Sequence, residues 1–131
     1  MLLDTSGLLC IYDAQDFRHA TASAFFRAAR QMLTSNYVLA EFIALAHARR
    51  LPRIGALDFI VDLQAVPRIE VMWIDETLHN RALALLQSRL DKTYSLCDAV
   101  SFLLMRERKL TEALTTDRHF EQEGFTRLLS S

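Results

Sequence analysis

Short apolar segments alternate with longer segments of helical periodicity along the chain, and this alternation constrains the fold more than any other feature. Strands are expected at residues 2–3, 32–34, 69–74, 113–116 and 125–129. Helices are expected at 8–12, 16–30, 36–50, 52–65, 76–89 and 95–108, with a turn or short helix at 119–122. Strands separated by helices form right-handed β-α-β units. The sequence therefore predicts a three-layer α/β/α fold with a short, mostly parallel central sheet.

The composition agrees with a helix-rich domain. The chain of 131 residues contains only three glycines and two prolines, whereas average usage would give about 16 of them together. All-β sandwiches and barrels need many turns, so the deficit disfavours them. A hydrophobic content of 51% argues against disorder. We expect one domain over residues 1–131.

Charge and cysteine usage indicate a soluble, cytoplasmic protein with no membrane segment. Cys10 and Cys97 form no C-x-x-C motif, and the first residues lack the basic segment of a signal peptide. No uncharged apolar run reaches the ~18 residues that span a bilayer. The net charge of −1 argues against binding of nucleic acid by bulk charge alone. Thirteen of the fifteen basic residues are arginines, which bind phosphate well, so an RNA ligand stays open.

Four carboxylates occupy positions that ordinary surface acids do not. Asp4 and Asp117 each follow an expected strand, and Asp98 stands near the start of a helix. Glu41 is the only charge in the apolar segment 37–46. Each acid also has a plainer interpretation. Asp4 and Asp117 could cap the following turn, Asp98 could form a capping box with Ser95, and Glu41 could point outward or pair with an arginine.

The four acids are more informative as a set. In a parallel α/β fold, the carboxyl ends of strands and the amino ends of helices share one rim, where ligands bind. Ionised carboxylates that converge there repel one another, and a divalent cation removes the conflict. Oxygen ligands select Mg²⁺ or Mn²⁺ over zinc. The four histidines show no metal-ligand spacing, so we expect most of them at the surface.

The chain resembles PIN-domain ribonucleases, and among them the small VapC-type toxins of prokaryotic toxin–antitoxin pairs. The segments that carry the resemblance are 3–9, 39–41, 95–102 and 115–120 followed by Gly124-Phe125. The resemblance implies that Asp4, Glu41, Asp98 and Asp117 bind one or two Mg²⁺ or Mn²⁺ ions. It also implies that a hydroxyl from Ser6 and one from Thr115 or Thr116 support the site.

The implied activity is endonucleolytic hydrolysis of RNA by a metal-activated water, leaving a 5′-phosphate and a 3′-hydroxyl. We expect Arg118, Arg49 and Arg50 as candidate phosphate contacts, with solvated helix-end charges as their plainer interpretation. His119 could assist proton transfer, although a surface position is the preferred expectation. The resemblance further implies a cognate antitoxin protein as partner and a homodimer.

Several alternatives stay open at this point. A PIN-type RNA-processing nuclease with no toxin role has the same motifs, and a non-catalytic PIN-fold binding module would keep the fold. Two phosphoryl-transfer folds fit less well. A haloacid-dehalogenase-like phosphatase needs a second aspartate where this chain has Ser6, and a receiver domain needs a lysine later than Lys109.

Overall fold

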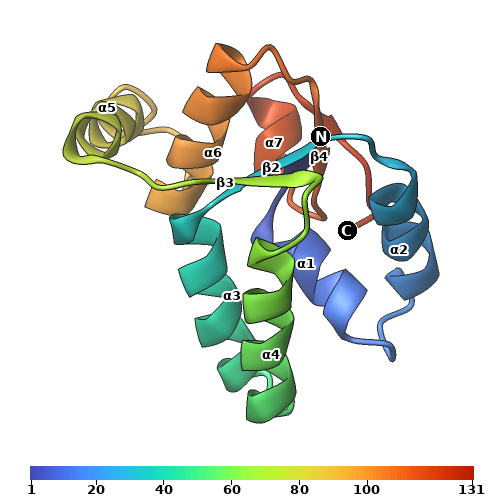
Figure 1. The fold of residues 1–131 in the computed structure, drawn as a ribbon. Helices are drawn as coiled ribbons and strands as arrows, with labels where there is room; N and C mark the ends of the chain where they lie inside the picture. The colour runs from blue at the N-terminus through green and yellow to red at the C-terminus, as the bar shows by residue number, and fades with distance from the viewer.

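The computed structural model describes residues 1–131, and a parallel five-stranded sheet lies at its centre (Figure 1). Every neighbouring pair of strands is parallel, and the strand order is β3-β2-β1-β4-β5. The strands are β1 (Leu2–Leu3), β2 (Met32–Ser35), β3 (Ile69–Met72), β4 (Glu112–Leu114) and β5 (Thr126–Arg127). The predicted three-layer α/β/α architecture is therefore confirmed, and the sheet is parallel throughout.

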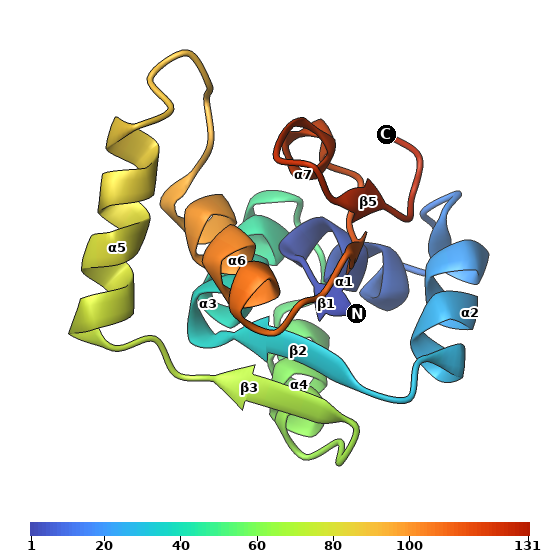
Figure 2. The same ribbon diagram turned by 90° about the horizontal axis from the view of Figure 1, so that it is seen from above.

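Seven helices cover the two faces of the sheet (Figures 1 and 2). They are α1 (Thr5–Tyr12), α2 (His19–Ala28), α3 (Asn36–Ala48), α4 (Arg53–Gln64), α5 (Glu76–Gln87), α6 (Leu96–Glu107) and α7 (Arg118–Gln122). Helices α1 to α4 pack against one face, and α5, α6 and α7 pack against the other. Successive strand residues point to opposite faces, so that Leu3 belongs to the first core and Leu2 to the second.

The ends of several elements differ from the prediction for identifiable reasons. The second helix starts at His19 rather than near residue 16, because Asp16 accepts hydrogen bonds from the backbone and guanidinium of Arg18 and forms a turn. Strand β4 ends at Leu114, because Thr115 leaves the sheet and directs its hydroxyl to Asp4. Two further strands are shorter than predicted: β3 ends at Met72 instead of residue 74, and β5 spans Thr126–Arg127 instead of 125–129.

Helix α1 lies directly on the end of β4, and Gly7 makes this contact possible. A Cβ atom at Gly7 would lie 2.0 Å from the carbonyl oxygen of Leu114. The close approach holds the start of α1, with Asp4 and Ser6, against the segment that follows β4. None of the seven helices combines the length and the apolarity that a bilayer span requires.

Candidate active site

The carboxyl ends of β1 and β4 are neighbours in the sheet, and the candidate site begins there. Leu3 pairs with Leu114 in the parallel register, so the residues that follow, Asp4 and Thr115, emerge side by side. Helices α6 and α7 begin on the same rim, with Asp98 in the first turn of α6 and Asp117 as the N-cap of α7.

Asp4 is a buried carboxylate held by two hydroxyl groups. It is only 4% exposed, and its Oδ2 accepts hydrogen bonds from Thr115 Oγ1 at 2.7 Å and Ser6 Oγ at 3.2 Å. Burial raises the pKa of Asp4 to about 7, against the lowering effect of the Thr115 bond. The charges of Asp98 and Glu41 raise this pKa further, so both acids lie within electrostatic reach of Asp4.

The sequence left open whether Thr115 or Thr116 supplies the hydroxyl beside Asp4. In the structure, the hydroxyl that hydrogen-bonds Asp4 is that of Thr115. Its Oγ1 also accepts a hydrogen bond from the Asp117 backbone N–H at 3.0 Å and lies 3.1 Å from Ser6 Oγ. Thr116 contributes through its backbone, because its N–H donates to Ser6 Oγ at 2.9 Å. This small network connects the loop after β4 with the start of α1 and fixes Asp4 between them.

Asp98 forms the capping box and lies in the site at the same time. The backbone N–H of Ser95 donates to Asp98 Oδ2 at 3.0 Å, and the Asp98 N–H donates to Ser95 Oγ at 3.0 Å. His119 Nδ1 lies 3.1 Å from the same Oδ2. Oδ1 receives no hydrogen bond, so capping leaves one oxygen free for a ligand. Burial raises the pKa of Asp98, while the bonds from Ser95 and His119 oppose the rise.

His119 is half-buried and contacts the acidic cluster, so it is not the isolated surface histidine that was expected from the sequence. Its Nδ1 is 3.1 Å from Asp98 Oδ2 and 3.4 Å from Asp117 Oδ1. One ligand atom from each of these three residues falls within 4.8 Å of the others. Two carboxylate oxygens face Nδ1, so this nitrogen carries a proton, and Nε2 accepts from Thr93 Oγ1 at 3.2 Å in the neutral ring.

None of the other histidines is fully buried: His47 is exposed, and His19 and His79 are half-buried at the surface. His19 Nδ1 lies 3.0 Å from the carbonyl oxygen of Cys10, and His79 Nδ1 bonds the hydroxyl of Tyr37. The sequence contained a usable signal for His119. It stands two residues after Asp117, the distance at which the first turn of a helix folds a side chain back beside its N-cap.

Glu41 approaches the cluster from α3, and the candidate arginines differ in their distance from it. Glu41 is half-buried, pairs with no basic residue and adds to the charge that raises the pKa of Asp4. Arg118 is exposed, adjacent to Asp117 and in no ion pair. Arg49 and Arg50 follow the far end of α3, about 12 Å along the helix axis from Glu41 at 1.5 Å per residue.

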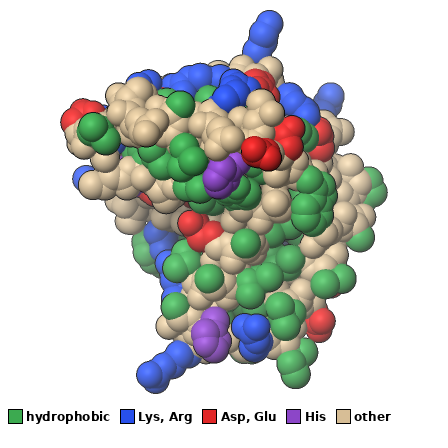
Figure 3. Space-filling view, turned by 90° about the vertical axis from the view of Figure 1, so that its left-hand side faces the viewer, with side chains coloured by type: hydrophobic (Ala, Val, Ile, Leu, Met, Phe, Trp, Pro, Cys, Tyr) green, Lys and Arg blue, Asp and Glu red, His purple; other side chains and the backbone are tan.

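The electrostatics of the site match a divalent cation. None of the four acids pairs with a lysine or arginine, and His119 is the only titratable base in contact with them. Burial and the nearby charges of Glu41, Asp4 and Asp98 raise the pKa of the Cys97 thiol, which stays protonated and is a poor ligand. The available donors are therefore carboxylate oxygens, which suit Mg²⁺ and Mn²⁺. On the face drawn in Figure 3, carboxylates and a histidine lie together near the centre, with basic side chains above and below them.

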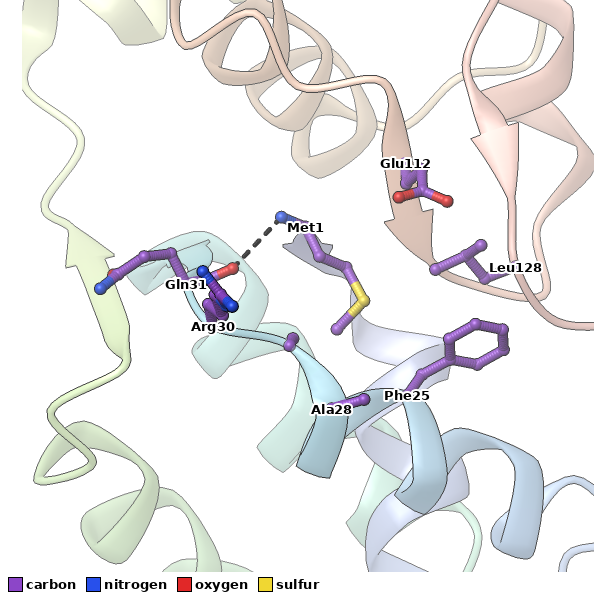
Figure 4. Close-up of a pocket in the computed structure, with 8 residues that line it drawn as sticks. Met1, Phe25, Ala28, Arg30, Gln31, Glu112 and Leu128 are labelled. Atoms are coloured by element: carbon purple, nitrogen blue, oxygen red, sulfur yellow. Dashed lines mark hydrogen bonds between the residues drawn. The ribbon is translucent and has the colours of Figure 1, made fainter.

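A separate cavity of about 370 Å³ lies at the opposite end of the strands (Figure 4). Met1, Gln31 and Glu112, which line it, stand before or at the start of β1, β2 and β4. The N-terminal amine donates to the Gln31 carbonyl oxygen at 3.3 Å. Because this cavity holds one carboxylate and lies away from the carboxyl ends of the strands, it is not the site that Asp4 and Asp98 form.

Comparison with known proteins identifies the family of the chain and supports its fold. The PIN domain family profile matches residues 1–125. The chain belongs to the PIN-domain family. Over 126 residues it is 31% identical to the 23S rRNA-specific endonuclease VapC20 in two strains of Mycobacterium tuberculosis, with 95% of each chain covered. The crystal structure of Mycobacterium tuberculosis VapC20, a sarcin-ricin loop cleaving toxin, superposes with a TM-score of 0.87 at 28% identity, again over 95% of each chain.

Proposed function

We propose that this PIN-domain protein is a metal-dependent endoribonuclease and a toxin of the VapC type. One observation carries the proposal. Asp98 and Asp117 converge with His119 on the rim where Asp4 is buried, and no lysine or arginine neutralises the acids. The similarity to an endonuclease toxin over 95% of the chain supports the interpretation of this cluster as the metal site of a nuclease.

The proposed metal site uses Mg²⁺ or Mn²⁺ with Asp4, Glu41, Asp98 and Asp117 as the residues that hold it. When bound, the ion supplies a water of lowered pKa and neutralises charge on the phosphate. Ser6 and Thr115 orient Asp4 by their hydrogen bonds, and Thr116 fixes Ser6 through its backbone. His119 holds the facing oxygens of Asp98 and Asp117 at a set separation.

RNA is the proposed substrate. The candidate arginines would contact phosphates at different distances from the scissile bond. Arg118 would contact a phosphate close to the scissile bond, and its exposed, unpaired position beside Asp117 supports this role. Arg49 and Arg50 would contact phosphates further along the strand. The relative is named for 23S rRNA and its structure for the sarcin-ricin loop. We therefore take a ribosomal RNA stem-loop of this kind as the first substrate to test.

The activity is tested by incubating the purified protein with a labelled stem-loop RNA and MnCl₂ or MgCl₂. Cleavage should produce 5′-phosphate and 3′-hydroxyl ends and stop in EDTA. Asp98→Asn should reduce the rate by at least a hundredfold, whereas Asp62→Asn, a change to an exposed acid on α4, should leave it unchanged. Activity that persists both in EDTA and in Asp98→Asn would exclude the metal-nuclease mechanism.

The toxin role implies a protein partner and a cytoplasmic target, and the surface of α4 supports the first of these. Ile54, Leu57 and Val61 form an exposed apolar stripe at helical spacing, with Ile54 80% exposed. We propose this stripe as part of the antitoxin-binding surface and a homodimer as the assembly.

Growth arrest on expression, relieved by the product of an adjacent small gene, separates a toxin from an RNA-processing nuclease. Light scattering measures the oligomeric state.

A further inference from the structure

Trp73, the only tryptophan of the chain, is 67% exposed at the end of β3. Tryptophan is mostly buried in folded proteins, because its ring system offers a large apolar area. Because tryptophan is enriched at binding interfaces, one that the fold leaves exposed is a candidate contact for another molecule.

The sheet register places Trp73 on the same rim as the carboxylates. Leu2 pairs with Leu33, and Leu33 pairs with Glu70, so Asp4 is level with Met72 and Trp73 stands one residue further along. Strands β1 and β3 are separated by β2 alone. At about 4.8 Å between neighbouring strands, the backbone of Trp73 lies about 10 Å along the rim from that of Asp4.

The backbone around Trp73 is held firmly on both sides. Strand β3 precedes it, and the next backbone N–H, that of Ile74, donates to Asn36 Oδ1 at 2.8 Å. Asp75 then caps α5 by accepting from the Leu78 N–H at 2.8 Å. The indole is thus presented from a fixed segment, so a ligand that stacks on it loses little free energy to ordering the protein.

A shallow cavity of about 190 Å³ lies beside Trp73. It is lined by the apolar side chains of Met72 and Leu78, by Asp75, and by Arg81, whose guanidinium is paired with Glu107. The apolar part of this lining, with the exposed indole, offers a surface on which a flat aromatic ligand can stack. Unpaired bases of RNA loops stack on exposed aromatic rings irrespective of their sequence.

We propose that Trp73 is a stacking platform for a base of the RNA strand that flanks the scissile phosphate. This inference rests on the proposed nuclease function and extends it, because it names a residue outside the acidic cluster that binds substrate. Trp73 contributes to RNA affinity through the face of its ring and takes no part in the metal site.

The single tryptophan allows a direct test by intrinsic fluorescence. The wild-type protein in EDTA is titrated with a single-stranded loop RNA, while anisotropy of the labelled RNA reports binding independently. Stacking should quench Trp73 emission in step with the anisotropy. Trp73→Ala should weaken binding about fivefold to a hundredfold, and Trp73→Phe should retain most of the affinity. Phe17→Ala removes an aromatic ring that is 76% exposed between α1 and α2, and it should leave affinity unchanged.

Binding of RNA without any change in Trp73 emission would overturn the proposal, as would wild-type affinity in Trp73→Ala. Emission that changes with protein concentration alone, together with loss of self-association in Trp73→Ala, would assign the ring to contact with a second copy and also overturn it. Because binding is measured in EDTA, these outcomes are independent of cleavage. The proposed nuclease function fails separately, through the metal and Asp98→Asn experiments.

Discussion

Burial raises the pKa of Asp4 to about 7, so the metal-free protein is destabilised whenever this carboxylate is ionised. The folded pKa lies above the unfolded value of 3.8. The penalty is therefore complete above pH 7 and disappears as the pH falls towards 4. Asp4→Asn removes the ionisable group, and since one pKa unit equals about 1.4 kcal/mol, we expect it to stabilise the protein in EDTA by at least about 1 kcal/mol at pH 8.

Urea unfolding of wild type and Asp4→Asn in EDTA at pH 8 and pH 4.5 measures this difference. The gain should shrink at pH 4.5, and RNA cleavage with Mn²⁺ should be lost at either pH. Asp58→Asn, a change to an exposed acid on α4, is the matched control and should show no such pH dependence. Equal stability of wild type and Asp4→Asn at pH 8 would contradict the buried-charge argument.

His119 bridges Asp98 and Asp117, and its removal tests whether this contact prepares the site for metal. His119→Ala leaves the two carboxylates without their shared N–H donor, so we expect Mn²⁺ affinity to fall about 10- to 100-fold. His119→Asn retains an N–H near the position of Nδ1 and should recover part of the affinity. Calorimetry measures both, with His47→Ala on the exposed side of α3 as the control.

The contact between α1 and β4 belongs to the scale of whole elements, and Gly7 carries it. A Cβ 2.0 Å from the Leu114 carbonyl oxygen cannot be accommodated without displacing the helix. Gly7→Ala should destabilise the protein by about 1–3 kcal/mol and weaken Mn²⁺ binding, because the start of α1 carries Asp4 and Ser6. Gly55→Ala is the comparison, since its Cβ meets the movable hydroxyl end of Tyr12 and should cost less. Denaturant unfolding ranks the two, and an equal cost would contradict the argument.

The order and type of the elements were predictable because the strands are short and buried while the helices between them are periodic. Helix α1 was predicted from residue 8, whereas it begins at Thr5. Only the structure shows that the chain turns into helix immediately after Asp4, since this depends on the tertiary contact of Gly7 with β4. The expected strand to residue 116 failed for a similar reason, because the Thr115 hydroxyl bonds Asp4 across the sheet.

At the scale of the whole molecule, the convergence of the acids could be predicted from the order of strands and helices. The contacts around each acid could not be predicted in this way. A parallel sheet sends Asp4 and Thr115 to one edge, and the sequence order alone implies this. The position of Asp117 two residues before His119 indicated that these two side chains lie close together, whereas the contact of His119 with Asp98 depends on how α7 packs beside α6 and could not be predicted from the sequence. The roles of the four acids as metal ligands stay predictions that solution experiments must test.

Metal binding should raise the stability of the whole protein, because the ion binds the folded chain and relieves the repulsion among its acids. At a free Mn²⁺ concentration 100 times its Kd, linkage gives about 2.7 kcal/mol, which corresponds to a rise in Tm of about 10 °C for a domain of this size. Thermal unfolding at pH 7.5 with and without Mn²⁺ measures the shift. Glu41→Gln and Asp98→Asn should each abolish most of it, whereas Asp62→Asn should keep it. A wild-type shift that survives in both site variants would mean that the ion binds elsewhere, since removing either of these two rim charges would then have no consequence.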